Sequence, residues 1–298
     1  MTGNQISQPV QFANTLEQVV FTLPQGARVS TYVGGPEQGA PVVLLHGGGT
    51  DNALLSWQDT MPALLQAGYR VYAPSFPGYG ESPPHELSTT TDGLIHCLEA
   101  LVDIWQVETA ALVGLSMGGA LALGYTLANQ ECVDRLVLVG PYGIQDRVPF
   151  HFLSYLYVRL PWMLDAAWAM MRRSRSTTRY MLNSLIRNPE SRTETLVDQV
   201  MEAIQNPHSQ RTFAQWQRDE MGPSGVKTNY TSRLDEIAVP VLLVHGSHDA
   251  GVPLAYAERA VSRFPNARLE VFENAGHWTQ RDYPERFNRL LLEFLADR

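Results

Sequence analysis

The chain of 298 residues contains only two cysteines, Cys97 and Cys132, and a single lysine, Lys227. Two cysteines give neither a disulfide framework nor a metal-binding spacing. No apolar run approaches the roughly 18 residues of a membrane-spanning helix, and the first ten residues lack the basic and apolar regions of a secretory signal. A net charge of −8 argues against a nucleic-acid partner. We therefore expect a cytoplasmic protein that binds neither membranes nor nucleic acid.

Apolar residues make up 44% of the chain, enough for one large core. Residues 16–22 and 27–33 alternate polar and apolar positions, as a hairpin at a sheet edge does. Continuous apolar runs, typical of buried parallel strands, lie at 41–45 and 110–113, and further strands are expected at 69–73, 134–139, 239–245 and 268–273. Helix-like segments separate most of these strands. The alternation predicts a mostly parallel eight-stranded sheet with helices on both faces.

Residues 145–233 interrupt this alternation, because they contain no clear strand. Helix-like segments lie near 150–172, 177–187, 193–206 and 207–220. We expect this region to be a helical lid inserted after the sixth strand. The chain then divides into a first part of the core (1–144), the lid (145–233) and a second part of the core (234–298).

The most informative stretch is residues 109–129, which reads as an apolar strand, a tight turn and a helix. The turn contains Gly114-Leu115-Ser116-Met117-Gly118, a G-x-S-x-G pattern. This pattern predicts a nucleophile elbow, a strained turn that lifts the Ser116 hydroxyl above the sheet edge. The residues two before and two after the serine must lack side chains, because the turn is crowded. An ordinary glycine-rich turn is the alternative interpretation.

A serine hydroxyl is a poor nucleophile at neutral pH and needs a base that is itself oriented by an acid. Asp249 follows the apolar strand VPVLLVHG, and His277 follows the strand RLEVF. Such groups collect at the carboxyl ends of parallel strands. The loop after the sixth strand, 140–143, contains no carboxylate that could replace Asp249. We predict Ser116 as nucleophile, His277 as general base and Asp249 as the residue that orients it.

Two backbone N–H groups should form an oxyanion hole, one from Met117 and one from Gly48. Gly48 lies in the His46–Gly49 turn after the third strand, where a glycine lets the substrate carbonyl come close. We expect His46 to shape this turn. His245 and His248 belong to one short cluster only, so we expect no metal. No motif calls for a cofactor.

These motifs resemble the α/β-hydrolase superfamily over about residues 16–297. The LLHGGG loop, the G-x-S-M-G-G elbow and the segment GHWTQRDYPERFNRLLLEFL are most similar to the meta-cleavage-product hydrolases. That subfamily splits carbon–carbon bonds in dienoate products of aromatic degradation. The resemblance implies that Ser116, Asp249 and His277 form the catalytic triad and that Trp278 lines the pocket. The residues expected in the substrate pocket are Gly47, Leu115, Tyr142 and Trp278.

The chain departs from that subfamily at three positions. Leu115 replaces the usual asparagine, and Ser75 replaces an aspartate. Val200 or Met201 stands where a lid arginine would grip the substrate carboxylate. Large apolar side chains also crowd residues 142–171, in and just before the predicted lid, and would line an apolar pocket or pack the lid onto the core. They are Tyr142, Phe150, Phe152, Tyr155, Tyr157, Trp162, Met163, Trp168, Met170 and Met171.

We predict a cofactor-free serine hydrolase that cleaves an ester or related acyl bond of a small, largely apolar substrate. Two alternatives stay open. One is carbon–carbon hydrolysis of a dienoate by the same residues, with a ketone as the reacting group. The other is a ligand-binding receptor on the same fold, since fold does not fix function. A homodimer formed through the exposed lid also stays open.

Overall fold

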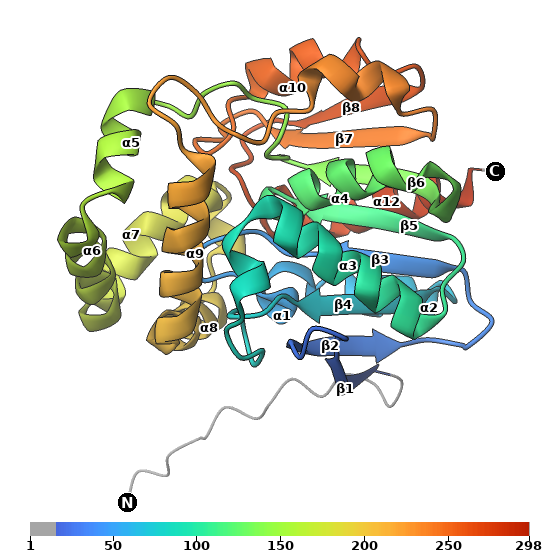
Figure 1. The fold of residues 1–298 in the computed structure, drawn as a ribbon, viewed down its shortest axis with the longest axis horizontal. Coiled ribbons are helices and arrows are strands. Elements are labelled where there is room, and N and C mark those ends of the chain that lie inside the picture. The colour runs from blue at the N-terminus through green and yellow to red at the C-terminus, as the bar shows by residue number, and fades with distance from the viewer. Residues whose placement is uncertain (1–15, 298) are drawn as a thin grey trace, which may run out of the picture.

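The computed structural model describes residues 16–297 (Figure 1). Residues 1–15, assigned above to the first part of the core, and Arg298 lie outside the described residues. The strands are β1 (Leu16–Thr22), β2 (Arg28–Gly34), β3 (Pro41–Leu45), β4 (Arg70–Ser75), β5 (Ala110–Leu115), β6 (Val133–Val139), β7 (Val241–Gly246) and β8 (Ala267–Phe272). They form one sheet in the order β1-β2-β4-β3-β5-β6-β7-β8. Only β1–β2 and β2–β4 pair antiparallel, so the predicted mostly parallel sheet is confirmed.

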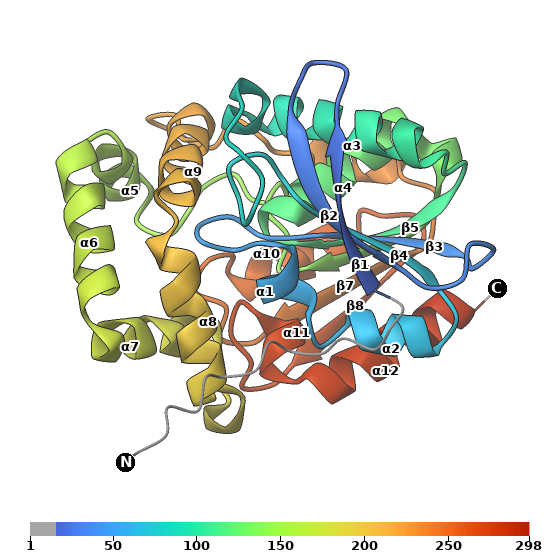
Figure 2. The same ribbon diagram turned by 90° about the horizontal axis from the view of Figure 1, so that it is seen from below.

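Helices cover both faces of this sheet. They are α1 (Ala53–Trp57), α2 (Met61–Gln66), α3 (Thr91–Trp105), α4 (Met117–Ala128), α10 (Leu254–Val261), α11 (Thr279–Asp282) and α12 (Pro284–Ala296). Figure 2 shows α3 and α4 on one side, with α1, α2 and α12 on the other. Strand side chains alternate between two separate cores. On β3, Val43 and Leu45 pack in the core under α3 and α4, whereas Val42 and Leu44 pack under α1 and α12.

Five further helices lie between β6 and β7 in the sequence. They are α5 (His151–Val158), α6 (Pro161–Arg173), α7 (Arg175–Leu185), α8 (Glu194–Gln205) and α9 (Pro207–Glu220). Figure 1 shows them together at one end of the sheet, beyond the arrowheads of the parallel strands. The division into core and lid at residues 145 and 233 stays a proposal. Among residues 16–297, no helix combines the length and apolarity needed to cross a membrane.

The predicted helix at 150–172 is two helices. The first, α5, ends at Val158, and the second, α6, begins at Pro161. Proline has no backbone N–H to donate, and its ring clashes with the preceding turn, so a helix cannot run through it. The first turn of a helix accepts proline readily. The continuous prediction was therefore wrong at a position that the sequence itself marks.

Several large apolar side chains of this region face solvent. They are Phe150, Phe152, Trp162 and Met170, which are 83%, 61%, 68% and 57% exposed. The prediction that they line a pocket or pack the lid onto the core is wrong for these four. The reason is their position, because α5 and α6 are the outermost elements of the insertion (Figure 1). The outer side of each helix has no element of the described chain to pack against.

Candidate active site

Ser116 lies between the end of β5 and the start of α4, with φ +51° and ψ −113°. A non-glycine residue in this backbone region is strained, and surrounding contacts must hold it there. The N–H of Ser116 donates to the Val139 carbonyl at 2.9 Å. The flanking glycines are required, because a Cβ at Gly114 would lie 2.3 Å from the Gly118 oxygen. A Cβ at Gly118 would lie 2.3 Å from the Leu45 oxygen.

We expect Gly114→Ala to destabilise the protein by about 2 to 3 kcal/mol, the usual cost of forcing an extra carbon into a packed site. The nearest atoms belong to the backbone, which cannot rotate away as a side chain can. Urea unfolding would measure the loss. Gly251→Ala is the matched control, because a Cβ there meets its nearest neighbours at an ordinary 3.5 Å. Equal unfolding midpoints for both variants would contradict the crowding argument.

His277 and Asp249 form a buried pair at the carboxyl end of the sheet. The Nδ1 atom of His277 lies 2.7 Å from Asp249 Oδ2. The other carboxylate oxygen, Oδ1, accepts the N–H groups of Gly251 and Val252, both at 2.8 Å. Burial favours the neutral form of each group, but their mutual attraction outweighs it. The pKa of Asp249 is therefore lowered and the pKa of His277 is raised.

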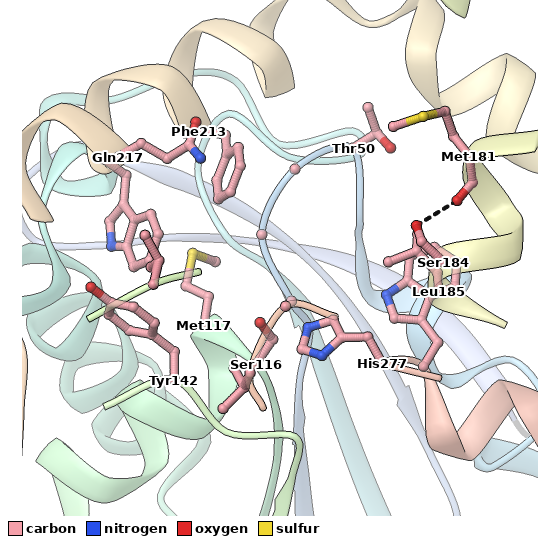
Figure 3. A pocket seen from close by; sticks show the side chains of 18 of the residues that line it. Thr50, Ser116, Met117, Tyr142, Met181, Ser184, Leu185, Phe213, Gln217 and His277 are labelled. Atoms are coloured by element: carbon pink, nitrogen blue, oxygen red, sulfur yellow. Dashed lines mark hydrogen bonds between the residues drawn. The ribbon is translucent and has the colours of Figure 1, made fainter. Parts of the chain in front are cut away.

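Ser116 and His277 open onto the same cavity of about 360 Å³. Figure 3 shows the serine hydroxyl beside the imidazole ring, with Tyr142 on the opposite side of the serine. Among residues 16–297, no hydrogen bond joins Ser116 to His277. Catalytic hydrogen bonds are often long before substrate binds. The sequence-predicted nucleophile, base and acid thus lie together at one end of the sheet.

The cavity wall contains most of the other predicted residues. They are Gly47, Gly48, Met117, Tyr142 and Trp278. Leu115 is absent from the described residues that line the cavity, and the prediction that it does so is wrong. Its side chain is fully buried in the core under α1 and α12, on the same face of β5 as Val113. Side chains two apart on a strand share a face, so Leu115 continues the core below the serine.

Along the residues that the structure describes, some backbone N–H groups near Ser116 already donate a hydrogen bond within the protein, and others are free to bind a substrate. The N–H of Gly47 donates to the Asp51 carboxylate at 2.9 Å, so it is already used. Gly48 follows it and lines the cavity. Met117 is the first residue of α4, where an N–H has no acceptor within the helix. Gly48 and Met117 therefore stay the predicted donors of the oxyanion hole, and both line the cavity.

His46 lies beneath this loop and is fully buried. One ring nitrogen, Nε2, accepts the N–H of Phe76 at 3.0 Å, and the other, Nδ1, lies 2.7 Å from the Gly47 carbonyl. Burial lowers the pKa of His46 to about 4, so the ring is neutral at physiological pH. His46 therefore shapes the glycine loop, as the sequence indicated.

Asp51 is a residue that the sequence analysis missed. It is fully buried and accepts hydrogen bonds from Gly47 N, Asn52 N and Ser56 Oγ at 2.9, 2.9 and 2.6 Å. Burial raises the pKa of Asp51 to about 6, although these hydrogen bonds oppose the rise. The available signal was an acidic residue directly after a glycine-rich loop at a strand end. Its contacts show that Asp51 positions the loop that carries Gly48.

The raised pKa of Asp51 predicts a specific pH dependence of stability. A carboxyl group with a higher pKa in the folded state is most stabilising below its ordinary pKa of 3.8. Its contribution is lost as the pH rises through about 6. A rise of about two units corresponds to about 3 kcal/mol. We expect the free energy of unfolding of Asp51→Asn, measured with urea, to rise by about this much relative to wild type between pH 4 and pH 7. A difference between the two proteins that does not change with pH would contradict the raised pKa of Asp51.

His245 and His277 both approach Asp249, since His245 Nε2 lies 3.4 Å and His277 Nδ1 lies 2.7 Å from Asp249 Oδ2. The Nε2 atom of His245 lies 2.7 Å from the Val252 carbonyl, which it can reach as a donor. His248 is exposed and contacts Ser247 instead. Within the described part of the chain, no group of three or more His, Cys, Asp or Glu residues could hold a metal ion.

The sequence of the chain matches a known protein family. Residues 40–284 match the family model described as alpha/beta hydrolase fold. The chain is 31% identical over 264 residues to a 2-hydroxy-6-oxononadienedioate/2-hydroxy-6-oxononatrienedioate hydrolase of Comamonas testosteroni, covering 87% of this chain and 89% of the relative. It is also 31% identical over 265 residues, with the same coverages, to a 2-hydroxy-6-oxo-6-phenylhexa-2,4-dienoate hydrolase of Burkholderia cepacia.

Solved structures of similar fold include hydrolases of the same kind as these relatives. The meta-cleavage product hydrolase of Pseudomonas fluorescens IP01 matches with a TM-score of 0.78 at 28% identity, covering 94% of this chain and 97% of that one. An esterase from Exiguobacterium antarcticum matches with a TM-score of 0.77 at 22% identity, covering 94% and 100%, and shows the shared fold alone. The chain is therefore an enzyme, a hydrolase that belongs to the α/β-hydrolase fold family.

Proposed function

We propose that this hydrolase cleaves a carboxylic ester, or a related acyl bond, of a small and largely apolar substrate. The observation that carries the proposal is the His277–Asp249 pair at 2.7 Å, which opens onto the same cavity as the strained Ser116. In this mechanism Ser116 Oγ attacks the carbonyl carbon while His277 Nε2 takes its proton. The developing oxyanion accepts hydrogen bonds from the N–H groups of Met117 and Gly48.

The imidazolium that forms in this step is stabilised by the Asp249 carboxylate. It then gives its proton to the leaving alcohol, and an acyl-enzyme remains on Ser116. Water, activated by His277, attacks the acyl carbon and releases the acid. The helices of residues 145–233 act as the lid in this proposal, because α7 and α9 supply much of the cavity wall. This wall keeps the acyl-enzyme away from bulk water.

The charge of the cavity supports a neutral substrate. Among the described residues that line it, none is arginine or lysine, and one, Glu220, is a carboxylate. Val200, at a position where the resemblance calls for arginine, is buried in the wall. The relatives from Comamonas testosteroni and Burkholderia cepacia are named for dienoate or dienedioate substrates, which are carboxylates. An unpaired carboxylate in a largely apolar cavity is strongly unfavourable, so this cavity suits a neutral ester better.

Carbon–carbon hydrolysis of a dienoate is the second candidate, and the names of these relatives favour it. It would use the same three residues, with attack on a ketone carbonyl. The relatives, which are named hydrolases, do not support the alternative of a ligand-binding receptor, and such a receptor gives no reason for a strained serine beside a buried His–Asp pair. The cytoplasmic location and the homodimer stay predictions.

A turnover panel separates the two enzymatic candidates. It would contain p-nitrophenyl esters of graded acyl length and a phenyl-substituted dienoate of the meta-cleavage type. We expect fast turnover of at least one ester and little turnover of the dienoate. The reverse pattern would assign the chain to carbon–carbon hydrolysis. Labelling of the serine by a fluorophosphonate probe checks that the protein used in the panel is active.

A further inference from the structure

One end of the cavity contains a buried carboxylate whose hydrogen bonds are all made within the protein. Glu220, the last residue of α9, is 1% exposed and lines the cavity. It accepts hydrogen bonds from Thr91 Oγ1 at 2.5 Å, from Thr228 Oγ1 at 2.8 Å and from Thr228 N at 3.0 Å. The fourth donor is Tyr142 Oη at 3.1 Å. A carboxylate offers about four acceptor positions, so Glu220 has none left for a substrate.

Glu220 instead fixes the direction of the Tyr142 hydroxyl. Burial, and then the charge and hydrogen bond of Glu220, raise the pKa of Tyr142, so the phenol keeps its proton. That single proton points to Glu220. Tyr142 also lines the cavity. Toward a substrate, its oxygen can therefore act only as a hydrogen-bond acceptor.

Gln145 adds an unpaired polar group to the same end. It is 1% exposed and lines the cavity, and its Oε1 atom has no hydrogen-bond partner among residues 16–297. Its loop lies against the chain that follows α9, because Val226 N donates to the Asp146 carbonyl at 3.0 Å. A buried polar atom without a partner is costly. An amide side chain can pair with a donor or an acceptor on a ligand.

We infer that Tyr142, whose hydroxyl is oriented by Glu220, and Gln145 form a subsite for a hydroxyl group on the acyl part of the substrate. A hydroxyl has one proton, which it can donate to Tyr142 Oη while its oxygen accepts an N–H of the Gln145 amide, or which it can donate to Gln145 Oε1 instead. A carboxylate has no proton to donate and would meet the charge of Glu220. An ammonium group would find no free carboxylate position on Glu220.

The position of the serine assigns this subsite to the acyl part. In Figure 3, Ser116 lies between Tyr142 and His277. His277 must protonate the leaving group, so the leaving group lies on the imidazole side. The acyl chain then extends toward Tyr142. The inference rests on the proposed esterase function and names its substrate class, esters of hydroxy acids whose hydroxyl is remote from the carbonyl.

The test uses p-nitrophenyl esters in matched sets of equal acyl length, ending in a methyl, a hydroxyl or a carboxylate group. At one length we expect kcat/KM for the hydroxyl ester to exceed that for the methyl ester by about 10-fold, the effect of one good hydrogen bond. The carboxylate ester should be the poorest. Equal or better turnover of the methyl ester at every length would overturn the inference but leave the esterase proposal intact. No turnover of any ester would overturn both.

Variants locate the effect. Tyr142→Phe should lower the hydroxyl-to-methyl ratio of kcat/KM by about 10-fold. Tyr180→Phe, which removes the same hydroxyl from a side chain 73% exposed on α7, should leave the ratio unchanged. Glu220→Gln should raise the carboxylate-to-methyl ratio by about 10-fold or more, because it removes a like charge. Each ratio is taken within one protein, so a loss of folded enzyme cancels. Unchanged ratios in both cavity variants would overturn the assignment of these residues.

Discussion

Ser116→Ala should lower kcat for the best ester by about 10⁴- to 10⁶-fold, because no covalent intermediate can form without the hydroxyl. The backbone should keep its geometry, because two backbone hydrogen bonds hold residue 116. Its N–H donates to the Val139 carbonyl at 2.9 Å, and its carbonyl accepts the N–H of Tyr142 at 2.9 Å. Alanine is also smaller than serine and creates no clash at the elbow. Steady-state kinetics on the ester panel and fluorophosphonate labelling would measure the loss.

Ser184 supplies the matched control for this variant. Its side chain lines the same cavity, and its hydroxyl donates to the Met181 carbonyl at 2.7 Å (Figure 3). Ser184→Ala therefore removes a cavity hydroxyl that is not beside His277, and we expect a loss below about 10-fold. Full activity in Ser116→Ala, or equal losses in the two variants, would rule out the proposed nucleophile.

Asp249→Asn should lower kcat by about 10⁴-fold, through the tautomer of His277. The backbone N–H groups of Gly251 and Val252 both point at Oδ1, so the amide oxygen of an asparagine would occupy that position. Its NH₂ group would then replace Oδ2, 2.7 Å from His277 Nδ1, and donate to that nitrogen. The ring proton would move to Nε2. A protonated Nε2 cannot accept the proton of Ser116.

The pH profile gives this variant a second readout. Burial alone lowers the pKa of His277, and the Asp249 charge and hydrogen bond raise it to a net value above 6.5. In wild type, activity should therefore rise with pH through a midpoint above 6.5. Without the carboxylate charge, the midpoint of the residual activity should move to lower pH. A loss below about 10-fold, with an unmoved midpoint, would remove Asp249 from the mechanism.

The sheet, and the meeting of Ser116, Asp249 and His277 at its edge, could be predicted because their signals are local. Buried parallel strands read as continuous apolar runs, and a nucleophile elbow requires glycines at fixed offsets from Ser116. Asp249 lies in the turn after β7, and His277 lies in the turn after β8. Strand ends meet at one edge of the sheet, so their side chains come together without any further information about packing.

The remaining parts of the site depend on contacts that no local pattern records. The buried Glu220 accepts a hydrogen bond from Thr91, which lies 129 residues earlier in the chain. Nothing near either residue indicates the other. Leu115 lies next to the nucleophile in sequence, yet the packing under α1 and α12 directs its side chain into the core. The prediction that the apolar side chains of α5 and α6 are buried was wrong in part for the same reason. Composition does not say which side of a helix packs against the rest of the protein.

The connection between β6 and β7 has an evolutionary consequence. These strands are neighbours in the sheet, and a parallel crossover needs only about a dozen residues. Here residues 140–240 make that crossover and include α5 to α9. Ser116, Asp249 and His277 all lie outside it. In the proposed mechanism, substitutions or exchange of the whole segment within the crossover can therefore change which substrates are accepted while Ser116, Asp249 and His277 are inherited unchanged. Recognition and chemistry can then diverge separately.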